Sequence, residues 1–133
     1  MRTERVSRAL FDVNVLIALL DSDHISHAAA TDWHRQHARH GWASCPITEN
    51  GTARVMSSAG YPNAVPIAEV LTRLRNAAQA SNHQFWPDDI SLTDGRRFDH
   101  RAILGPKQIT DRYLLALAVK HNGRFILRPS SDN

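Results

Sequence analysis

The stretch LFDVNVLI, residues 10–17, places a single acidic residue, Asp12, between two apolar segments. Residues 7–12 predict a short buried strand that ends in this acid, and residues 14–20 predict a helix that begins directly after it. A carboxylate within an apolar stretch is costly unless a partner compensates its charge. Asp12 is therefore either the cap of the following helix or a ligand for a cation, and this stretch alone favours neither.

The rest of the chain continues this alternation of short apolar strands with helices. We expect strands at residues 42–45, 83–86 and 124–127, helices at residues 27–40, 47–59, 67–80 and 109–121, and a short helix at residues 99–104. This alternation predicts an α/β domain with a short parallel sheet of about four to five strands flanked by helices. No internal repeat or domain boundary is evident, so we expect residues 1–133 to form a single domain.

The composition is that of a globular protein, with 42% hydrophobic and 22% charged residues. The formal net charge of +3 fits a polyanionic partner, but it is also ordinary for a dissolved protein. Cys45 is the only cysteine, so no intramolecular disulfide can form, and we expect a cytoplasmic location. The apolar run at residues 15–20 is too short to span a membrane, and we expect no membrane association.

Two further acids stand at junctions of the same kind. Glu49 follows the second expected strand, and Asp111 lies at the start of the last expected helix. Taken singly, each is an acid that the helix dipole favours in a first turn. Together with Asp12 they form a set, in which each acid lies beside a strand end or a helix start. Mg²⁺ and Mn²⁺ prefer several oxygen ligands, and such sites supply the hydroxide and the charge neutralisation that phosphodiester hydrolysis needs.

Three motifs of the chain resemble the acidic motifs of PIN domains, in particular those of VapC-type ribonuclease toxins. The motifs are LFDVNVLI at residues 10–17, PITENG at residues 46–51 followed by Arg54, and ITDRYLLALA at residues 109–118. Their order and spacing extend the resemblance over nearly the whole chain. It implies a PIN-like α/β fold and a Mg²⁺- or Mn²⁺-dependent endoribonuclease, the toxin of a type II toxin–antitoxin system.

The resemblance also implies roles for individual residues. Asp12, Glu49 and Asp111 match the catalytic acids, which are also the metal ligands. Asn14 is expected to support the site by a hydrogen bond that orders the loop around Asp12, and Thr110 is expected to have a similar supporting role.

Several partners follow from the same resemblance. An RNA substrate is implied, with Arg112 and Arg54 as candidate contacts, and the sequence does not choose between transfer RNA and ribosomal RNA. Toxins of this type are generally homodimers, and a cognate antitoxin protein occupies the active-site groove. We expect the dimer surface on the helices within residues 47–80.

One departure from the family pattern concerns a fourth acid, which PIN domains often carry just after the last strand. Pro129 stands at that position, and Asp132 follows three residues later. Asp94 and Asp99 are other candidates, but we expect both to be surface acids. The departure favours one metal site over two. It also keeps an alternative open, a catalytically weakened PIN-fold binding module that binds RNA or an antitoxin. A DNA-binding regulator has little support, because no recognition helix is evident.

The histidines and tryptophans are expected to have ordinary roles. His24 and His27 have helical spacing, as do the histidines within residues 34–40, but neither group matches a known zinc motif. We therefore expect a polar helix face in this region in place of a zinc site. The tryptophans are expected in the core, and they are Trp33, Trp42 and Trp86.

Overall fold

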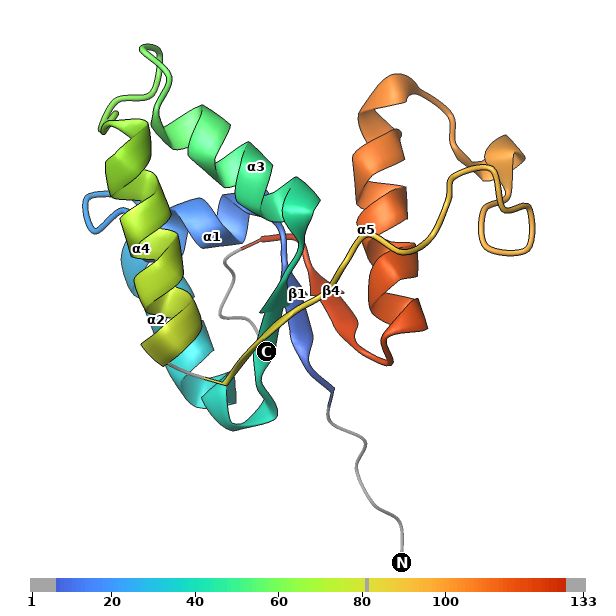
Figure 1. The fold of residues 1–133 in the computed structure, drawn as a ribbon, viewed down its shortest axis with the longest axis horizontal. Helices are drawn as coiled ribbons and strands as arrows, with labels where there is room; N and C mark the ends of the chain where they lie inside the picture. The colour runs from blue at the N-terminus through green and yellow to red at the C-terminus, as the bar shows by residue number, and fades with distance from the viewer. Residues whose placement is uncertain (1–6, 81, 129–133) are drawn as a thin grey trace, which may run out of the picture.

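The computed structural model describes residues 7–80 and 82–128, and a parallel sheet of four short strands lies at its centre (Figure 1). The strands are β1 (Ala9–Phe11), β2 (Trp42–Ser44), β3 (His83–Phe85) and β4 (Arg124–Ile126). Their order across the sheet is β3-β2-β1-β4, and all neighbours run parallel. The first strand is therefore an inner strand, where Leu10 pairs with Ala43 on one side and with Phe125 on the other. The predicted α/β fold with a short parallel sheet is confirmed.

The described residues form five α-helices around this sheet. They are α1 (Val13–Leu20), α2 (His27–His37), α3 (Pro46–Met56), α4 (Ile67–Ala80) and α5 (Ile109–Lys120). Figure 1 shows α1, α2, α3 and α4 together on one side of the strands, and α5 by itself on the other side. None of the helices within residues 7–80 and 82–128 combines the length and the apolar character needed to cross a lipid bilayer.

Alternating side chains of β1 divide the core between these two sides, since successive residues of a strand point to opposite faces. Leu10 belongs to the cluster that includes Leu114 of α5. Phe11 belongs to a second cluster, with Leu16 of α1 and Trp42 of β2. The strand that carries Asp12 at its end is thus fixed by packing on both faces.

The buried position of Cys45 and of two tryptophans agrees with the sequence. Cys45 follows β2 and is fully buried, and burial raises the pKa of its thiol to about 11, so the reactive thiolate is disfavoured. Trp42 and Trp86 are buried as predicted. Trp33 is only half-buried, with its ring edge-on to that of Phe11 at a centroid distance of 5.6 Å.

The end of α3 differs from its prediction. The helix expected at residues 47–59 begins one residue earlier and ends three residues earlier. Serine hydroxyls take up the carbonyls of its last turn: Ser57 Oγ donates to Ala53 at 2.7 Å, and Ser58 Oγ donates to Val55 at 2.9 Å. Local bonds of this kind compete with continued helix, which explains the early end.

Other differences occur at 3₁₀ turns, whose short length leaves little periodicity to detect. The helix expected at residues 27–40 gives way to a 3₁₀ turn at Ala38–His40. The helix expected at residues 99–104 is a 3₁₀ turn over His100–Ala102, and another 3₁₀ turn, Pro106–Gln108, leads into α5.

Candidate active site

Asp12 lies at the carboxyl end of β1, at the point where α1 begins. Its backbone N–H donates to the Ile126 carbonyl of β4 at 3.0 Å, and its own carbonyl accepts from Val15 and Leu16 of α1 at 3.0 and 3.1 Å. The residue is only 7% exposed. It occupies the N-cap position of α1, yet its side chain makes no capping hydrogen bond. The backbone N–H groups of Val13 and Asn14 lie close enough to lower the pKa of Asp12, so its role as a cap is weak at most.

The charge on Asp12 is poorly compensated. Burial raises the pKa of its carboxyl group and the charge of Asp111 raises it further, while the backbone N–H groups of Val13 and Asn14 offset only part of this effect. The side chain of Asn14 donates to it weakly, because Nδ2 lies 3.5 Å from Asp12 Oδ2, at the outer limit of a hydrogen bond. No cationic side chain in the described part of the chain forms an ion pair with Asp12.

Asp111 approaches the same edge from α5, where it lies in the first turn. It is exposed, and it makes no hydrogen bond or ion pair with any residue in the ranges 7–80 and 82–128. Thr110 is also exposed, and no hydrogen bond joins it to another described residue. The charge of Asp111 thus acts on the carboxyl group of Asp12, whereas Thr110 makes no bond to a described residue that would support either acid.

Glu49 lies in the first turn of α3 and is turned toward β2. Its Oε2 accepts a hydrogen bond from Ser44 Oγ at 3.0 Å, and Ser44 is 2% exposed. Among the residues that the structure describes, no hydrogen bond or ion pair joins Glu49 to Asp12 or Asp111. Of the three predicted acids, two interact with each other and the third is held by a serine.

A close contact between α1 and α3 sets the distance between the elements that carry Asp12 and Glu49. A Cβ atom added to Gly51 would lie 2.6 Å from Val13 Cγ2, so any other residue here would force the two helices or the Val13 side chain to shift. Gly51 lies two residues after Glu49, and Val13 directly follows Asp12. The first turn of α3 is therefore fixed against the start of α1.

These side chains fit a hard divalent cation at the pair of aspartates. Asp12 and Asp111 offer carboxylate oxygens that repel each other, and such oxygens are the ligands that Mg²⁺ and Mn²⁺ prefer. Glu49 Oε1 makes no hydrogen bond to a described residue, so one of its oxygens is also available. Over residues 7–80 and 82–128, no three acidic, histidine or cysteine side chains are already arranged to hold a metal ion. The pair fits a cation, and the predicted trio is not assembled.

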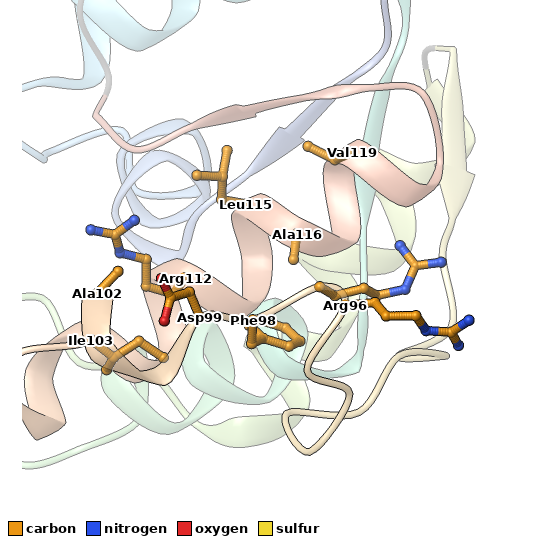
Figure 2. Close-up of a pocket in the computed structure, with 10 residues that line it drawn as sticks. Arg96, Phe98, Asp99, Ala102, Ile103, Arg112, Leu115, Ala116 and Val119 are labelled. Atoms are coloured by element: carbon orange, nitrogen blue, oxygen red, sulfur yellow. The ribbon is translucent and has the colours of Figure 1, made fainter.

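A groove of about 430 Å³ lies between α5 and residues 96–103 (Figure 2). Arginine and apolar side chains line it together, among them Arg96, Arg97, Arg112, Leu115 and Val119. Arg112 follows Asp111 in the sequence, and it lines this groove whereas Asp111 does not. Arg54, the other predicted RNA contact, is exposed in the last turn of α3 and does not line this groove.

A second pocket, of about 350 Å³, is lined by Asn14 at the start of α1. Its other polar lining residues are His24, Ser26, Tyr61 and Arg128. Sequence reasoning did not single out Arg128, although it precedes Pro129, where the family pattern has an acid. A basic residue next to that position is the signal that could have identified it.

The candidates for a fourth acid do not join the site. Pro129 and Asp132 lie outside the described residues. Asp94 forms ion pairs with neighbouring arginines in its own loop, and Asp99 forms one with Arg101 at 3.3 Å.

The histidines of α2 are partly exposed, and two of their rings are also bonded to backbone carbonyls. His27 Nδ1 lies 2.8 Å from the Ala18 carbonyl, and His37 Nδ1 lies 2.8 Å from the Trp33 carbonyl. Both rings are thus bound to the backbone, where they stabilise the fold. These bonds to carbonyls could not be predicted from the spacing of the histidines, and the polar helix face stays a prediction.

Comparison with known proteins shows the family of the chain. The family model described as the PIN domain matches residues 9–128. The chain is 47% identical to Ribonuclease VapC44 of Mycobacterium tuberculosis, over 90% of its own length and 84% of the relative's. It is 40% identical to Ribonuclease VapC39 of the same species, over 89% and 86% of the two chains. Its identity to Ribonuclease VapC29 is 35%, over 87% and 81%. The chain therefore belongs to the PIN-domain family, within the group of the VapC proteins, as its three motifs predicted.

Proposed function

We propose that this protein is a metal-dependent endoribonuclease, the toxin of a toxin–antitoxin pair, which hydrolyses phosphodiester bonds of RNA. Its family and the relatives named as ribonucleases support this function. The observation that carries the proposal is the pair of aspartates: Asp12 is buried, has no cationic partner in the described part of the chain, and interacts with a second carboxylate, Asp111. A cation bound between such groups relieves both the burial of charge and the repulsion.

The proposed metal is Mg²⁺ or Mn²⁺, with Asp12 and Asp111 as ligands and Glu49 as a further ligand through Oε1. When bound, such an ion supplies an activated water and neutralises charge that develops on the phosphate. Asn14 restrains the Asp12 carboxylate through its weak hydrogen bond. Thr110 has the least support among the assigned residues, because it makes no bond to either aspartate in the described structure.

The proposed RNA contacts are Arg112 and Arg54, both exposed. Guanidinium groups bind phosphate through charge-assisted hydrogen bonds, which position a strand without reading its sequence. Arg112 is the better supported of the two, because it adjoins Asp111 and shares a groove with Arg96 and Arg97.

The same proposal includes a cognate antitoxin, a homodimer and a cytoplasmic location. Ile67 and Leu71 of α4 are 60% and 43% exposed, and adjacent apolar side chains of this kind support a dimer contact within residues 47–80. The single cysteine, Cys45, is consistent with a reducing compartment.

A catalytically weakened binding module is the second candidate function. Pro129 at the position of the fourth acid favours it, as does the absence of a preformed trio of ligands among the described residues. Such a module would bind RNA or an antitoxin through the same surface without cutting.

Cleavage of total cellular RNA by the purified protein, free of antitoxin, tests the proposal. The reaction is run with Mg²⁺, with Mn²⁺ and with a chelator, for the natural chain and for Asp12→Asn and Asp111→Asn. Asp32→Asn is the matched control, because Asp32 is an exposed acid on α2 whose one ion pair among the described residues is with Arg35. Thermal unfolding with and without Mn²⁺ reports ion binding separately, because an ion that binds only the folded state raises its stability.

Discrete fragments that require metal, persist in Asp32→Asn and vanish in the two site variants are the expected result. If the folded natural chain is stabilised by Mn²⁺ or binds RNA but cuts nothing, the binding module replaces the enzyme.

A further inference from the structure

A chain of two hydrogen bonds connects Glu49 to a histidine on a different strand. Ser44 Oγ lies 3.0 Å from Glu49 Oε2 and 2.7 Å from His83 Nε2. Ser44 ends β2, Glu49 lies in the first turn of α3, and His83 begins β3. The three side chains thus join the end of one strand, the helix that follows it and the neighbouring strand of the sheet.

The direction of each bond follows from the hydrogens available. An ionised carboxylate can only accept, and a serine hydroxyl has one hydrogen to donate, so Ser44 donates to Glu49. The His83 ring must then donate from Nε2 to Ser44 Oγ, which assigns the Nε2–H tautomer. Burial lowers the pKa of His83 and the charge of Arg8 lowers it further, which favours the neutral ring that this tautomer describes.

The two outer members of the chain hold the serine in one orientation. Ser44 is 2% exposed and its strand pairs with β3, where Ser44 is in register with Phe85. The His83 ring is itself restrained by Trp42, whose ring centroid lies 4.4 Å away. When Ser44 Oγ accepts a hydrogen bond from His83, its own hydrogen is directed at Glu49. Rotation of this hydroxyl away from Glu49 would break a hydrogen bond at a buried group, which is costly.

We propose that Ser44 and His83 are positioning residues for Glu49, which fix its Oε2 and present Oε1 to the divalent cation. The inference rests on the proposed function, because it requires Glu49 to be a metal ligand. A free glutamate side chain has several rotatable bonds, so a bond that removes this freedom before the ion arrives strengthens the site. Partners that orient metal ligands typically contribute about 10–100-fold to metal affinity.

The test is Mn²⁺ binding to the full chain, measured by isothermal titration calorimetry in the absence of RNA. Ser44→Ala is expected to weaken Mn²⁺ binding by about 10-fold or more, because Glu49 loses its donor. Ser44→Thr keeps a hydroxyl and is expected to bind nearly as the natural chain does. His83→Phe is expected to have an intermediate effect, because the serine then loses its own donor.

Two controls and one double variant make the comparison specific. Ser58→Ala removes an exposed hydroxyl bonded only to the Val55 carbonyl, and His100→Phe removes an exposed ring. Neither is expected to change Mn²⁺ affinity. In a chain that already carries Glu49→Ala, adding Ser44→Ala should have no further effect, since the serine acts through the glutamate. Circular dichroism confirms that each variant is folded.

A direct readout exists without metal, because ¹⁵N-detected NMR distinguishes the two neutral tautomers of histidine. The natural chain is expected to show the Nε2–H form of His83, and Glu49→Gln or Ser44→Ala is expected to change the signal. A His83 ring that carries its hydrogen on Nδ1 would overturn the inference.

The outcomes separate the inference from the function it rests on. If the natural chain binds Mn²⁺ and Ser44→Ala binds it equally, the positioning role fails and the proposed function stands. If Ser44→Ala weakens binding equally with and without Glu49, the effect is structural and the inference also fails. If the natural chain binds no Mn²⁺ at all, both are overturned.

Discussion

Helix α1 has a buried aspartate just beyond each end, and the two differ in their hydrogen-bond donors and in the direction of their pKa shifts. Asp21, at the C-terminal end, is 3% exposed and accepts from the Tyr61 hydroxyl, from Asn63 Nδ2 at 2.9 Å and from the Asp23 backbone N–H at 3.0 Å. Burial acts to raise the pKa of Asp21, yet these hydrogen bonds together lower it. Asp12, at the other end, has a raised pKa and one weak side-chain donor.

The difference separates a structural acid from a ligand. A buried carboxylate that is surrounded by donors stabilises the fold as an anion, because its lost hydration is replaced. A buried carboxylate whose donors do not offset its burial, and which is repelled by another acid, destabilises the fold until a cation binds. Burial alone therefore does not identify the functional acid, and the donors around each carboxylate do.

The largest expected effect is that of Asp12→Asn on RNA cleavage. Loss of several kcal/mol of metal-dependent stabilisation corresponds to a decrease in rate on the order of a thousandfold. The free energy of unfolding without metal should be unchanged or higher, since a neutral amide removes the repulsion from Asp111. Cleavage assays and urea denaturation measure the two effects. A large loss of stability in Asp12→Asn would mean that the two ends of α1 do not differ as described.

The next largest effect is that of Asp21→Ala on stability. The substitution leaves the Tyr61 hydroxyl and the Asn63 amide without their acceptor, and we expect it to lower the free energy of unfolding by about 2–4 kcal/mol. RNA cleavage should persist at temperatures where the variant is folded. Asp32→Ala, an exposed acid, serves as the control and should change stability by less than about 0.5 kcal/mol. Full stability in Asp21→Ala would contradict the structural role.

The pH dependence of the free energy of unfolding should also show the stabilising role of Asp21. The pKa of Asp21 is lower in the folded state than in the unfolded state, so its carboxylate stabilises the fold above the unfolded value of about 3.9. That contribution is lost as the pH falls through the lower, folded pKa. The stability difference between the natural chain and Asp21→Asn, measured by urea denaturation, should therefore be largest near neutral pH and shrink in acid. If this stability difference grew in acid, folding would raise the pKa of Asp21, which would contradict the prediction.

The smallest expected effects come from the amides beside the two acids, which form a matched pair. Asn63 donates at 2.9 Å and Asn14 at 3.5 Å. Asn63→Ala should lower the free energy of unfolding by about 1–1.5 kcal/mol without affecting cleavage. Asn14→Ala should change stability by less than about 0.5 kcal/mol and lower cleavage a few-fold. Equal losses of stability in the two variants would remove the contrast between the ends of α1.

The sheet, the long helices and Asp12 could be predicted because their signals are local. Apolar runs ending in an acid, as at residues 10–12, carry the strand and its edge in a few consecutive positions. The end of α3 could not be predicted, since it depends on whether Ser57 and Ser58 bond backward to the helix. The region around residues 99–108 has only 3₁₀ turns, which leave no periodic pattern.

The surroundings of each acid could not be predicted from the sequence, for another reason. Ser44 and His83 are 39 positions apart, and Asp21 and Tyr61 are 40 apart. Only the fold brings them together, and no spacing rule relates them. The sequence therefore identified Asp12, Glu49 and Asp111 as candidates, but it did not show that Glu49 would be bonded to a serine while the two aspartates interact.

The position of β1 between β2 and β4 has a consequence for how the protein is made. The backbone N–H of Asp12 is bonded to Ile126, and Asp12 interacts with Asp111, so its partners are synthesised about a hundred residues after it. At roughly 5–20 residues per second, that interval lasts several seconds. During this time the nascent chain has neither β4 nor α5, and the proposed cutting edge does not exist. The ribosome, which is itself built of RNA, therefore synthesises α5 and β4 before the proposed nuclease site can form.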